Sequence, residues 1–226
     1  MRKKIGLHVA IEIDAVLSRY GKAAEETTCG GFRVRRFELD DYDLYVLHAG
    51  VGEIAAASAV QILISEFHVD VVVNFGVVGG LTEEMTLART VIVDRVVHYD
   101  MDSSELDGTP VGYYAENQGI YIPVTEALVE KACEIAPDLK RVTCASADKF
   151  VGDPAKKAAL HEKFGADICE MEAAAVAMTC NRNKVPVMMI KAVSDSILGG
   201  AEEFNTAVER ASDEAFGVTD RVIRAL

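Results

Sequence analysis

Short runs of β-branched residues alternate along this chain with segments whose apolar residues recur at helical spacing, and this alternation restricts the fold to few classes. The run VDVVVNFG at residues 69–76 has the composition of a strand that is buried on both faces. The segment before it, residues 53–67, carries apolar residues at helical spacing, which predicts an amphipathic helix. A helix that leads into a central strand indicates an α/β sandwich.

The same alternation continues to the end of the chain, without a linker, a low-complexity segment or an internal repeat. Since 226 residues fit one large domain, we expect a single α/β domain over residues 1–226. Further strands are predicted at 5–11, on both sides of a hairpin turn at 40–43, and at 89–100, 141–148, 166–170 and 185–195; further helices are predicted at 124–136, 154–164, 172–181 and 202–226.

Composition excludes several classes of protein. A net charge of −13 would repel a polyphosphate backbone, so we expect no nucleic-acid partner. No apolar run reaches the roughly 18 residues that cross a bilayer, and Glu12 and Asp14 interrupt the apolar N-terminal segment. The five cysteines and five histidines are dispersed without metal-ligand spacing. We therefore expect a cytoplasmic protein with no membrane partner, no metal and no cofactor.

Two glutamates, Glu170 and Glu172, stand in the stretch ICEMEAAAVA among residues that are expected to be buried. Buried carboxylates lose hydration, so they shift their pKa values or find partners. A glutamate in the first turn of a helix also interacts favourably with the helix dipole, which would explain Glu172 without a ligand. These residues alone leave both explanations open.

Polar residues and glycines follow six of the predicted strands. Ligands of α/β sheets bind beyond the carboxyl ends of the strands, so these residues are candidates for one site. The stretch AGVGEIAAA lacks the third glycine of the dinucleotide fingerprint and NFGVVGGL lacks the lysine of a P-loop, so tight turns explain each stretch as well as a ligand does. The candidates are Glu12 and Asp14, 50–52, 76–80, 148–151, 170–172, and 194–195.

The combination of GVG-EIAAA, NFGVVGGL, the Phe150-Val151 step, EMEAAAVA and AVSD resembles the nucleoside phosphorylase and nucleosidase superfamily. It is most similar to the methylthioadenosine/S-adenosylhomocysteine nucleosidases, and the resemblance runs from Ile5 to about Phe204. It implies a three-layer α/β/α sandwich around a mixed central sheet, a homodimer, and hydrolysis of the N-glycosidic bond of 5′-thio-substituted adenosines. Such hydrolysis needs an acid for the purine, a grip on the ribose and a base for the attacking water.

The resemblance assigns the purine acid and the ribose contact. Asp195 matches the family's acid, which protonates purine N7, and Ser194 beside it would fix its orientation. Glu172 matches the carboxylate that holds the ribose hydroxyls, where hydrogen bonds to an ionised acceptor are strong. By resemblance, a sugar is therefore the partner of Glu172.

Further residues of the substrate site are assigned in the same way. Met171 would lie along the sugar and Phe150 would stack on the base. The backbone of Val151 would bind the purine edge. Val51 is expected to line the substrate site, and Glu170 is expected at its edge.

Three positions on the water and ribose side differ from the family pattern. The water-activating glutamate aligns with Asp14, which is one methylene shorter, and Glu12, expected on the same strand face, is the rival base. Val77 stands where the family has a serine, which removes a hydroxyl near the water. Lys191 replaces an arginine that steadies the water and the ribose carboxylate, and it keeps the charge but loses the planar fork.

These differences leave alternatives open. One is another purine nucleosidase, acting on futalosine or a 6-oxopurine nucleoside, and another, from a different class, is a nucleoside-binding protein without catalysis. A phosphorylase is disfavoured, because Phe75 and Val77 replace the arginine and serine that hold phosphate in such enzymes. Leu106 and Phe204 are candidates for the pocket of the 5′ substituent, with core or interface packing as their other explanation.

Overall fold

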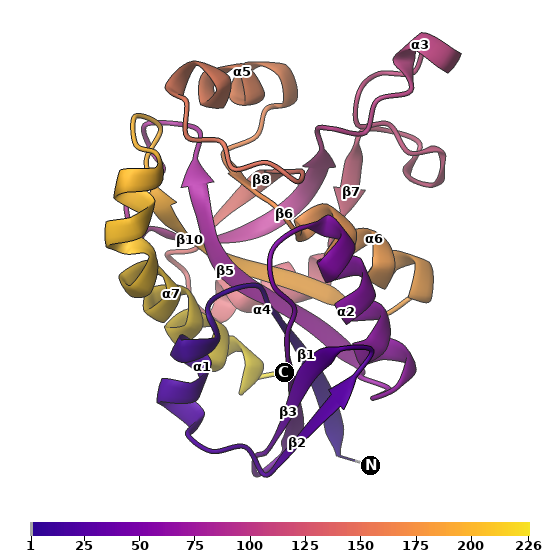
Figure 1. Cartoon of the computed structure of the whole chain (residues 1–226), viewed down its shortest axis with the longest axis vertical. Helices are drawn as coiled ribbons and strands as arrows, with labels where there is room; N and C mark the ends of the chain where they lie inside the picture. The colour runs from indigo at the N-terminus through magenta and orange to yellow at the C-terminus, as the bar shows by residue number, and fades with distance from the viewer. Residues whose placement is uncertain (1) are drawn as a thin grey trace.

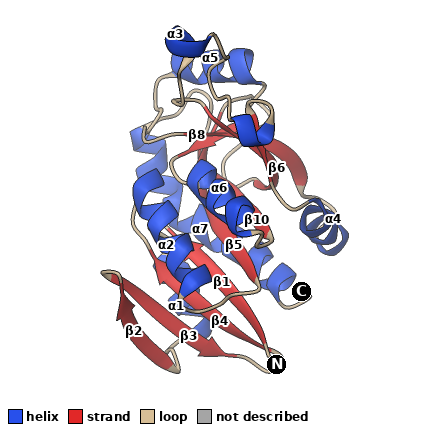
Figure 2. Cartoon of the chain, turned by 90° about the vertical axis from the view of Figure 1, so that its right-hand side faces the viewer, coloured by secondary structure: helices blue, strands red, loops and turns tan. Residues whose placement is uncertain are grey.

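The computed structural model describes residues 2–226 and contains one mixed sheet with helices on both of its faces (Figures 1 and 2). The strands are β1 (Lys3–Val9), β2 (Glu25–Cys29), β3 (Phe32–Glu38), β4 (Tyr42–His48), β5 (Val71–Gly80), β6 (Thr90–His98), β7 (Tyr121–Pro123), β8 (Lys140–Ser146), β9 (Ile168–Glu170) and β10 (Val187–Asp195). The helices are α1 (Ile13–Tyr20), α2 (Glu53–Ser65), α3 (Ser104–Asp107), α4 (Glu126–Ile135), α5 (Pro154–Phe164), α6 (Ala173–Asn183), α7 (Ala201–Ile223) and the 3-10 turn η1 (Ala115–Asn117).

The sheet has ten strands in the order β10-β6-β8-β9-β5-β1-β4-β3-β2, with β7 beside β6. β10 also pairs with β5, so β5, β10, β6, β8 and β9 close into a ring from which β1, β4, β3 and β2 extend. β1 runs parallel to β4 and β5, and β5 runs parallel to β10, whereas β10 and β6 are antiparallel. β5 is buried along almost its whole length, as expected for a strand covered on both faces.

Two layers of helices cover this sheet. α7 packs on β10 and β5 and contacts α1 and α4, whereas α2 packs against α6 and on β1. Figure 1 shows α7 and α2 on opposite sides of the sheet. The structure therefore confirms the three-layer α/β/α sandwich. Within residues 2–226, each helix is too short or too polar to pass through a bilayer.

α5 lies beyond the ends of the central strands (Figure 1, top) and has sharply defined boundaries. Its N-cap Asp153 accepts a hydrogen bond from the Lys156 backbone N–H at 2.9 Å, and Pro154 occupies the first turn. Gly165 ends the helix in the left-handed conformation with φ 59°. Lys157 of this helix is fully buried, while the adjacent Lys156 is exposed.

The predicted elements are present, and the differences fall on segments with little apolar patterning. Neither β2, whose residues are mostly exposed, nor the short strand β7 is predicted from the sequence. α1 is not predicted either, because the first strand was expected to continue to residue 11. The strand ends at Val9, and Asp14 lies in the first turn of α1, so the expectation that Glu12 and Asp14 share a strand face is wrong.

Candidate active site

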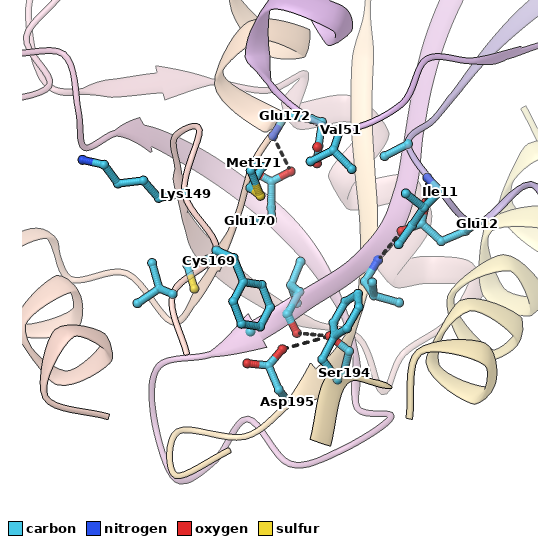
Figure 3. A pocket seen from close by; sticks show the side chains of 17 residues that line it. Ile11, Glu12, Val51, Lys149, Cys169, Glu170, Met171, Glu172, Ser194 and Asp195 are labelled. Carbon is cyan, nitrogen blue, oxygen red and sulfur yellow. Dashed lines mark hydrogen bonds between the residues drawn. The ribbon is translucent and has the colours of Figure 1, made fainter. Parts of the chain in front are cut away.

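A cavity of about 270 Å³ opens where the chain leaves the carboxyl ends of β1, β5, β9 and β10 (Figure 3). β1, β5 and β10 are parallel and end at the same edge of the sheet, and β9 pairs antiparallel with the end of β5, so residues far apart in the sequence meet there. The cavity is lined by residues 10–12, Val51, 77–79, 149–151, 169–172, 194–195 and Phe204.

All but two of the residues predicted for the site line this cavity. The first exception is Asp14, whose side chain is exposed on α1. The second is Lys191, which is 2 % exposed and is not a lining residue. The residues that do line the cavity are Glu12, Val51, Val77, Phe150, Val151, Glu170, Met171, Glu172, Ser194 and Asp195.

Glu170 and Glu172 are both buried, but their surroundings differ. Glu170 accepts hydrogen bonds from the backbone N–H groups of Glu172 at 3.1 Å and Ala173 at 3.0 Å, and it pairs with Lys191 Nζ at 3.2 Å. Burial opposes ionisation of Glu170, but Lys191 and these donors outweigh it, so the pKa of Glu170 lies below its usual value. Glu172 accepts a hydrogen bond from the Gly52 N–H at 2.8 Å. Burial and the neighbouring charge of Glu170 raise the pKa of Glu172 to about 8.

Lys191 therefore serves Glu170 directly. Burial disfavours its charged form, but the nearby Glu170 and Glu172 outweigh burial and raise the pKa of Lys191 above its usual value. By resemblance, the arginine that Lys191 replaces would contact the attacking water and the carboxylate that holds the ribose. In this chain the lysine lies beneath the cavity and forms its ion pair with Glu170.

Asp195 is 1 % exposed at the end of β10. The Ser194 hydroxyl lies 3.0 Å from Asp195 Oδ1 and 3.2 Å from the Val78 carbonyl oxygen, so both acceptors hold this hydroxyl in place (Figure 3). On its other side, Asp195 Oδ2 accepts a hydrogen bond from Lys157 Nζ at 2.5 Å. Sequence reasoning missed Lys157, since nothing distinguishes it from Lys156 until α5 is packed on the sheet.

Glu12 is 6 % exposed and its carboxylate is held by the backbone. Its Oε1 accepts from the Val77 N–H at 2.9 Å, and its Oε2 accepts from the Ile11 N–H at 3.0 Å. The approach to β5 is so close that a Cβ on Gly76 would lie 2.7 Å from Glu12 Oε1. The fixed carboxylate of Glu12 thus faces the cavity, whereas that of Asp14 does not line it.

Two aromatic rings form part of the cavity wall. Phe150 is 50 % exposed and meets Phe204 edge to face, with ring centroids 5.6 Å apart. Val151, the next residue, is buried. Phe204 thus lines the cavity as the sequence suggested, whereas Leu106 lies on α3 and is 89 % exposed.

The cavity is acidic. Four of its lining side chains are carboxylates, and its one lining cation, Lys149, pairs with Asp100 at 2.7 Å. Within residues 2–226, no group of three His, Cys, Asp or Glu side chains is arranged to hold a metal ion. The arrangement can donate and accept protons and can stabilise positive charge.

The fold and the cavity define an α/β/α protein in which carboxylates from separate strand ends line one small cavity. The chain belongs to the phosphorylase superfamily, whose family model matches residues 5–224.

Relatives and solved structures agree with this assignment. A 5′-methylthioadenosine/S-adenosylhomocysteine nucleosidase from Geobacillus is 31 % identical over 222 residues, which cover 94 % of this chain and 92 % of the relative. An aminodeoxyfutalosine nucleosidase from Campylobacter jejuni is 31 % identical over 73 % of this chain and 72 % of the relative. The crystal structure of a 5′-methylthioadenosine/S-adenosylhomocysteine nucleosidase from Helicobacter pylori matches with a TM-score of 0.94 at 26 % identity, covering 100 % of both chains.

Proposed function

We propose that this protein hydrolyses the N-glycosidic bond of 5′-methylthioadenosine and S-adenosylhomocysteine and releases adenine. The observation that carries the proposal is that Glu12, Glu172 and Asp195 line one cavity from three different strand ends. The names of the relatives support the choice of substrate.

Asp195 is the proposed acid for the leaving base. A purine that departs with the electron pair of the bond gains negative charge, and a proton on N7 neutralises it. Proton transfer by a positioned side chain accelerates such steps by about 10²- to 10⁴-fold. The hydrogen bond with Ser194 supports a fixed direction for the carboxyl group, and the ring of Phe150 offers a surface on which the base can stack.

Glu172 and Glu12 are the proposed groups on the sugar side. The ribose becomes positively charged as the bond breaks, and a carboxylate that accepts its hydroxyl protons stabilises that charge. Glu12 is the proposed base for the attacking water, because two backbone N–H groups fix its carboxylate at the cavity. Asp14 is not retained in this role, since its side chain is exposed outside the lining.

Hydrolysis is favoured over phosphorolysis by the charge of the cavity. A phosphate dianion needs cationic donors, as in bidentate arginine contacts. Among the lining residues Lys149 is the one cation, and Asp100 already pairs with it. Two of the four lining carboxylates are paired with buried lysines, and the other two, Glu12 and Glu172, are held by backbone N–H groups. Such oxygens accept the protons of water and sugar hydroxyls and do not attract a dianion.

A futalosine-type nucleoside is the second candidate substrate. The observation that favours it is the relative from Campylobacter jejuni, which is named an aminodeoxyfutalosine nucleosidase. Such a nucleoside keeps the purine and the ribose, so the same three carboxylates would act on it.

The test is chromatographic. The purified protein is incubated with methylthioadenosine, S-adenosylhomocysteine, adenosine, inosine and futalosine, with and without phosphate, and free base is quantified. Release of adenine from the two thio-nucleosides without phosphate is the expected result. Release from futalosine alone would transfer the mechanism to that substrate, and bound nucleoside without any free base would identify a non-catalytic binder.

We further propose that residues 1–226 form one domain of a cytoplasmic homodimer. The apolar side chain of Ile54 supports an interface, because it is 81 % exposed in the single chain and lines a surface groove together with Ala57 and Met178. Light scattering should then give twice the mass of one chain, and the mass of a single chain would contradict the dimer.

A further inference from the structure

Lys157 carries a buried amino group beside the site that none of the roles above uses. The residue is 0 % exposed, and its Nζ lies 2.5 Å from Asp195 Oδ2, 2.6 Å from the Ser196 carbonyl oxygen and 3.1 Å from the Gly199 carbonyl oxygen. An ammonium has three N–H bonds to donate, whereas a neutral amine has two. The three acceptors around Nζ therefore match the ammonium form of Lys157.

This contact fixes the state of Asp195 as well. Asp195 Oδ2 accepts from Lys157, and Oδ1 lies next to the Ser194 hydroxyl. A carboxylate oxygen 2.5 Å from a buried ammonium is the arrangement of an ion pair, in which the carboxylate is ionised. An ionised carboxylate cannot protonate a purine, so the proton for the leaving base has to come from the group with which Asp195 is paired.

We propose that the acid of this site is the Lys157–Asp195 pair, in which Lys157 gives a proton to Asp195 and Asp195 passes it to the purine. The inference rests on the proposed hydrolysis. Lys157 makes no contact with the substrate in this scheme and is a positioning residue that acts through Asp195.

The step balances without a further reactant. An N–H bond of Lys157 breaks as an O–H bond forms at Asp195; that O–H bond then breaks as an N–H bond forms at purine N7, and the purine keeps the electron pair of the broken C1′–N9 bond. The attacking water gives its proton to Glu12. After the products leave, Glu12 releases that proton to solvent and Lys157 takes one up, so both side chains return to their starting states.

Two other titratable groups face this pair from neighbouring elements. Cys169 at β9 lines the same cavity, and burial raises the pKa of its thiol to about 12, so it stays neutral. Glu203 in α7 accepts from the Ser196 N–H at 2.7 Å. Glu203 thus holds the segment 196–200, and Lys157 holds the same segment through the carbonyl oxygens of Ser196 and Gly199. A Glu203 variant therefore separates the support of this segment by Lys157 from the transfer of a proton to Asp195.

Four variants separate proton transfer from Lys157 to Asp195 from the support that Lys157 gives to segment 196–200. Lys157→Met removes the charge and keeps a long side chain, and Lys157→Arg keeps the charge but cannot release a proton. Lys156→Met makes the same change at the exposed neighbour on α5. Glu203→Ala loosens segment 196–200 from α7 without altering the Asp195 contact.

The readouts are kcat and KM from pH 5 to pH 9, with circular dichroism to confirm folding. Lys157→Met and Lys157→Arg should both lose about 100-fold in kcat at neutral pH with little change in KM. In Lys157→Met, kcat should rise as the pH falls, because a lone carboxyl must take its proton from solvent. Lys156→Met should match the wild type, and Glu203→Ala should keep the wild-type pH profile.

Full activity of Lys157→Arg, or a Lys157→Met variant that behaves like Glu203→Ala, would overturn the inference and leave hydrolysis standing. If the Lys157 variants do not fold, the wild-type profile decides: a plateau of kcat through neutral pH supports the pair, and a steady decline from pH 5 upward overturns it. A wild-type protein that releases no base from any nucleoside overturns the proposed function as well.

Discussion

Lys191 forms an ion pair with Glu170, with Nζ 3.2 Å from Oε2; both side chains are buried, and Glu170 lines the cavity whereas Lys191 does not. The pair neutralises one of two adjacent carboxylates and leaves the other, Glu172, with a backbone N–H as its hydrogen-bond partner. Since Glu170 also accepts from the first N–H groups of α6, its position is fixed by the start of that helix. Glu172 is the carboxylate that remains available to a ligand.

Substrate binding should depend on the ionisation of Glu172. Burial and Glu170 raise the pKa of Glu172 to about 8, so most of it is protonated at pH 6. Ribose hydroxyls donate to the ionised form, so KM should fall by up to about tenfold per unit as the pH rises from 6 toward 8. In Glu172→Gln, KM should be higher and should not change over this range. A wild-type KM that is constant from pH 6 to pH 8 would argue against the ribose contact.

Replacing the carboxyl group of Asp195, through which the proton reaches the base, should reduce kcat more than it weakens binding. Asp195→Asn keeps the size of the side chain and an acceptor for Ser194, but it cannot transfer a proton. We expect kcat to fall by about 10³-fold, within the range for general acids, with KM changed by a small factor. Asp213→Asn makes the same change at an exposed position on α7 and should leave both constants at wild-type values. Unaltered turnover by Asp195→Asn would exclude it as the acid.

The base for water is tested by a pair of substitutions two residues apart. Glu12→Gln removes the carboxylate that Val77 and Ile11 hold at the cavity, and kcat should fall by about 10²-fold or more. Asp14→Asn changes an exposed side chain on α1 and should be nearly silent. The measurement is kcat of both variants at saturating substrate. A large loss in Asp14→Asn with little change in Glu12→Gln would identify Asp14 as the base.

Stability should fall with rising pH because of Glu53. This residue is 9 % exposed, and its carboxyl oxygens lie 2.5 Å from the Ser146 hydroxyl and 2.5 Å from the Ala175 N–H. Burial and Glu170 raise the pKa of Glu53 from 4.5 to about 8. Between these values the folded protein keeps a proton that the unfolded chain releases, so the free energy of unfolding decreases as pH rises through this window. The loss attributable to Glu53 is on the order of 5 kcal/mol at most.

Glu53→Gln is the variant that isolates this effect. The amide can still accept from Ala175 and donate to Ser146, but it does not titrate. Thermal unfolding is measured from pH 5 to pH 9. The free energy of unfolding should decline less with pH in the variant than in the wild type, and the difference between the two proteins should be largest above pH 7. Parallel curves for the two proteins would show that Glu53 is not protonated in the folded state.

The sequence predicts that residues following several strands form one site. An apolar run indicates a buried strand, and the glycines, acids and hydroxyls after it indicate where that strand ends. Asp195 and Glu172 were found in this way. The location of Asp14 was mistaken, since no residue between Val9 and Ile13 signals that the strand stops and a helix begins. Asp14 was therefore expected in the site together with Glu12, whereas in the structure Glu12 lines the cavity and Asp14 does not.

Other features depend on packing that leaves no local trace. Lys156 and Lys157 are identical in type and adjacent, and only the orientation of α5 decides that the second one meets Asp195, 38 positions further along the chain. Glu53 was expected simply as the start of a helix, and its burial arises where α2 meets α6. The closure of the sheet by β10 and β5 is likewise a long-range pairing that periodicity does not encode.

The source of the oxygen added to the sugar distinguishes hydrolysis from phosphorolysis and from binding without catalysis. Methylthioadenosine is incubated with the protein in phosphate buffer made with ¹⁸O-labelled water, and the sugar product is analysed by mass spectrometry as soon as adenine appears, against an unenzymatic control for exchange. We expect one adenine released for each free sugar formed, with ¹⁸O from water at C1. A sugar 1-phosphate in place of the labelled free sugar, or no adenine at all, would contradict it.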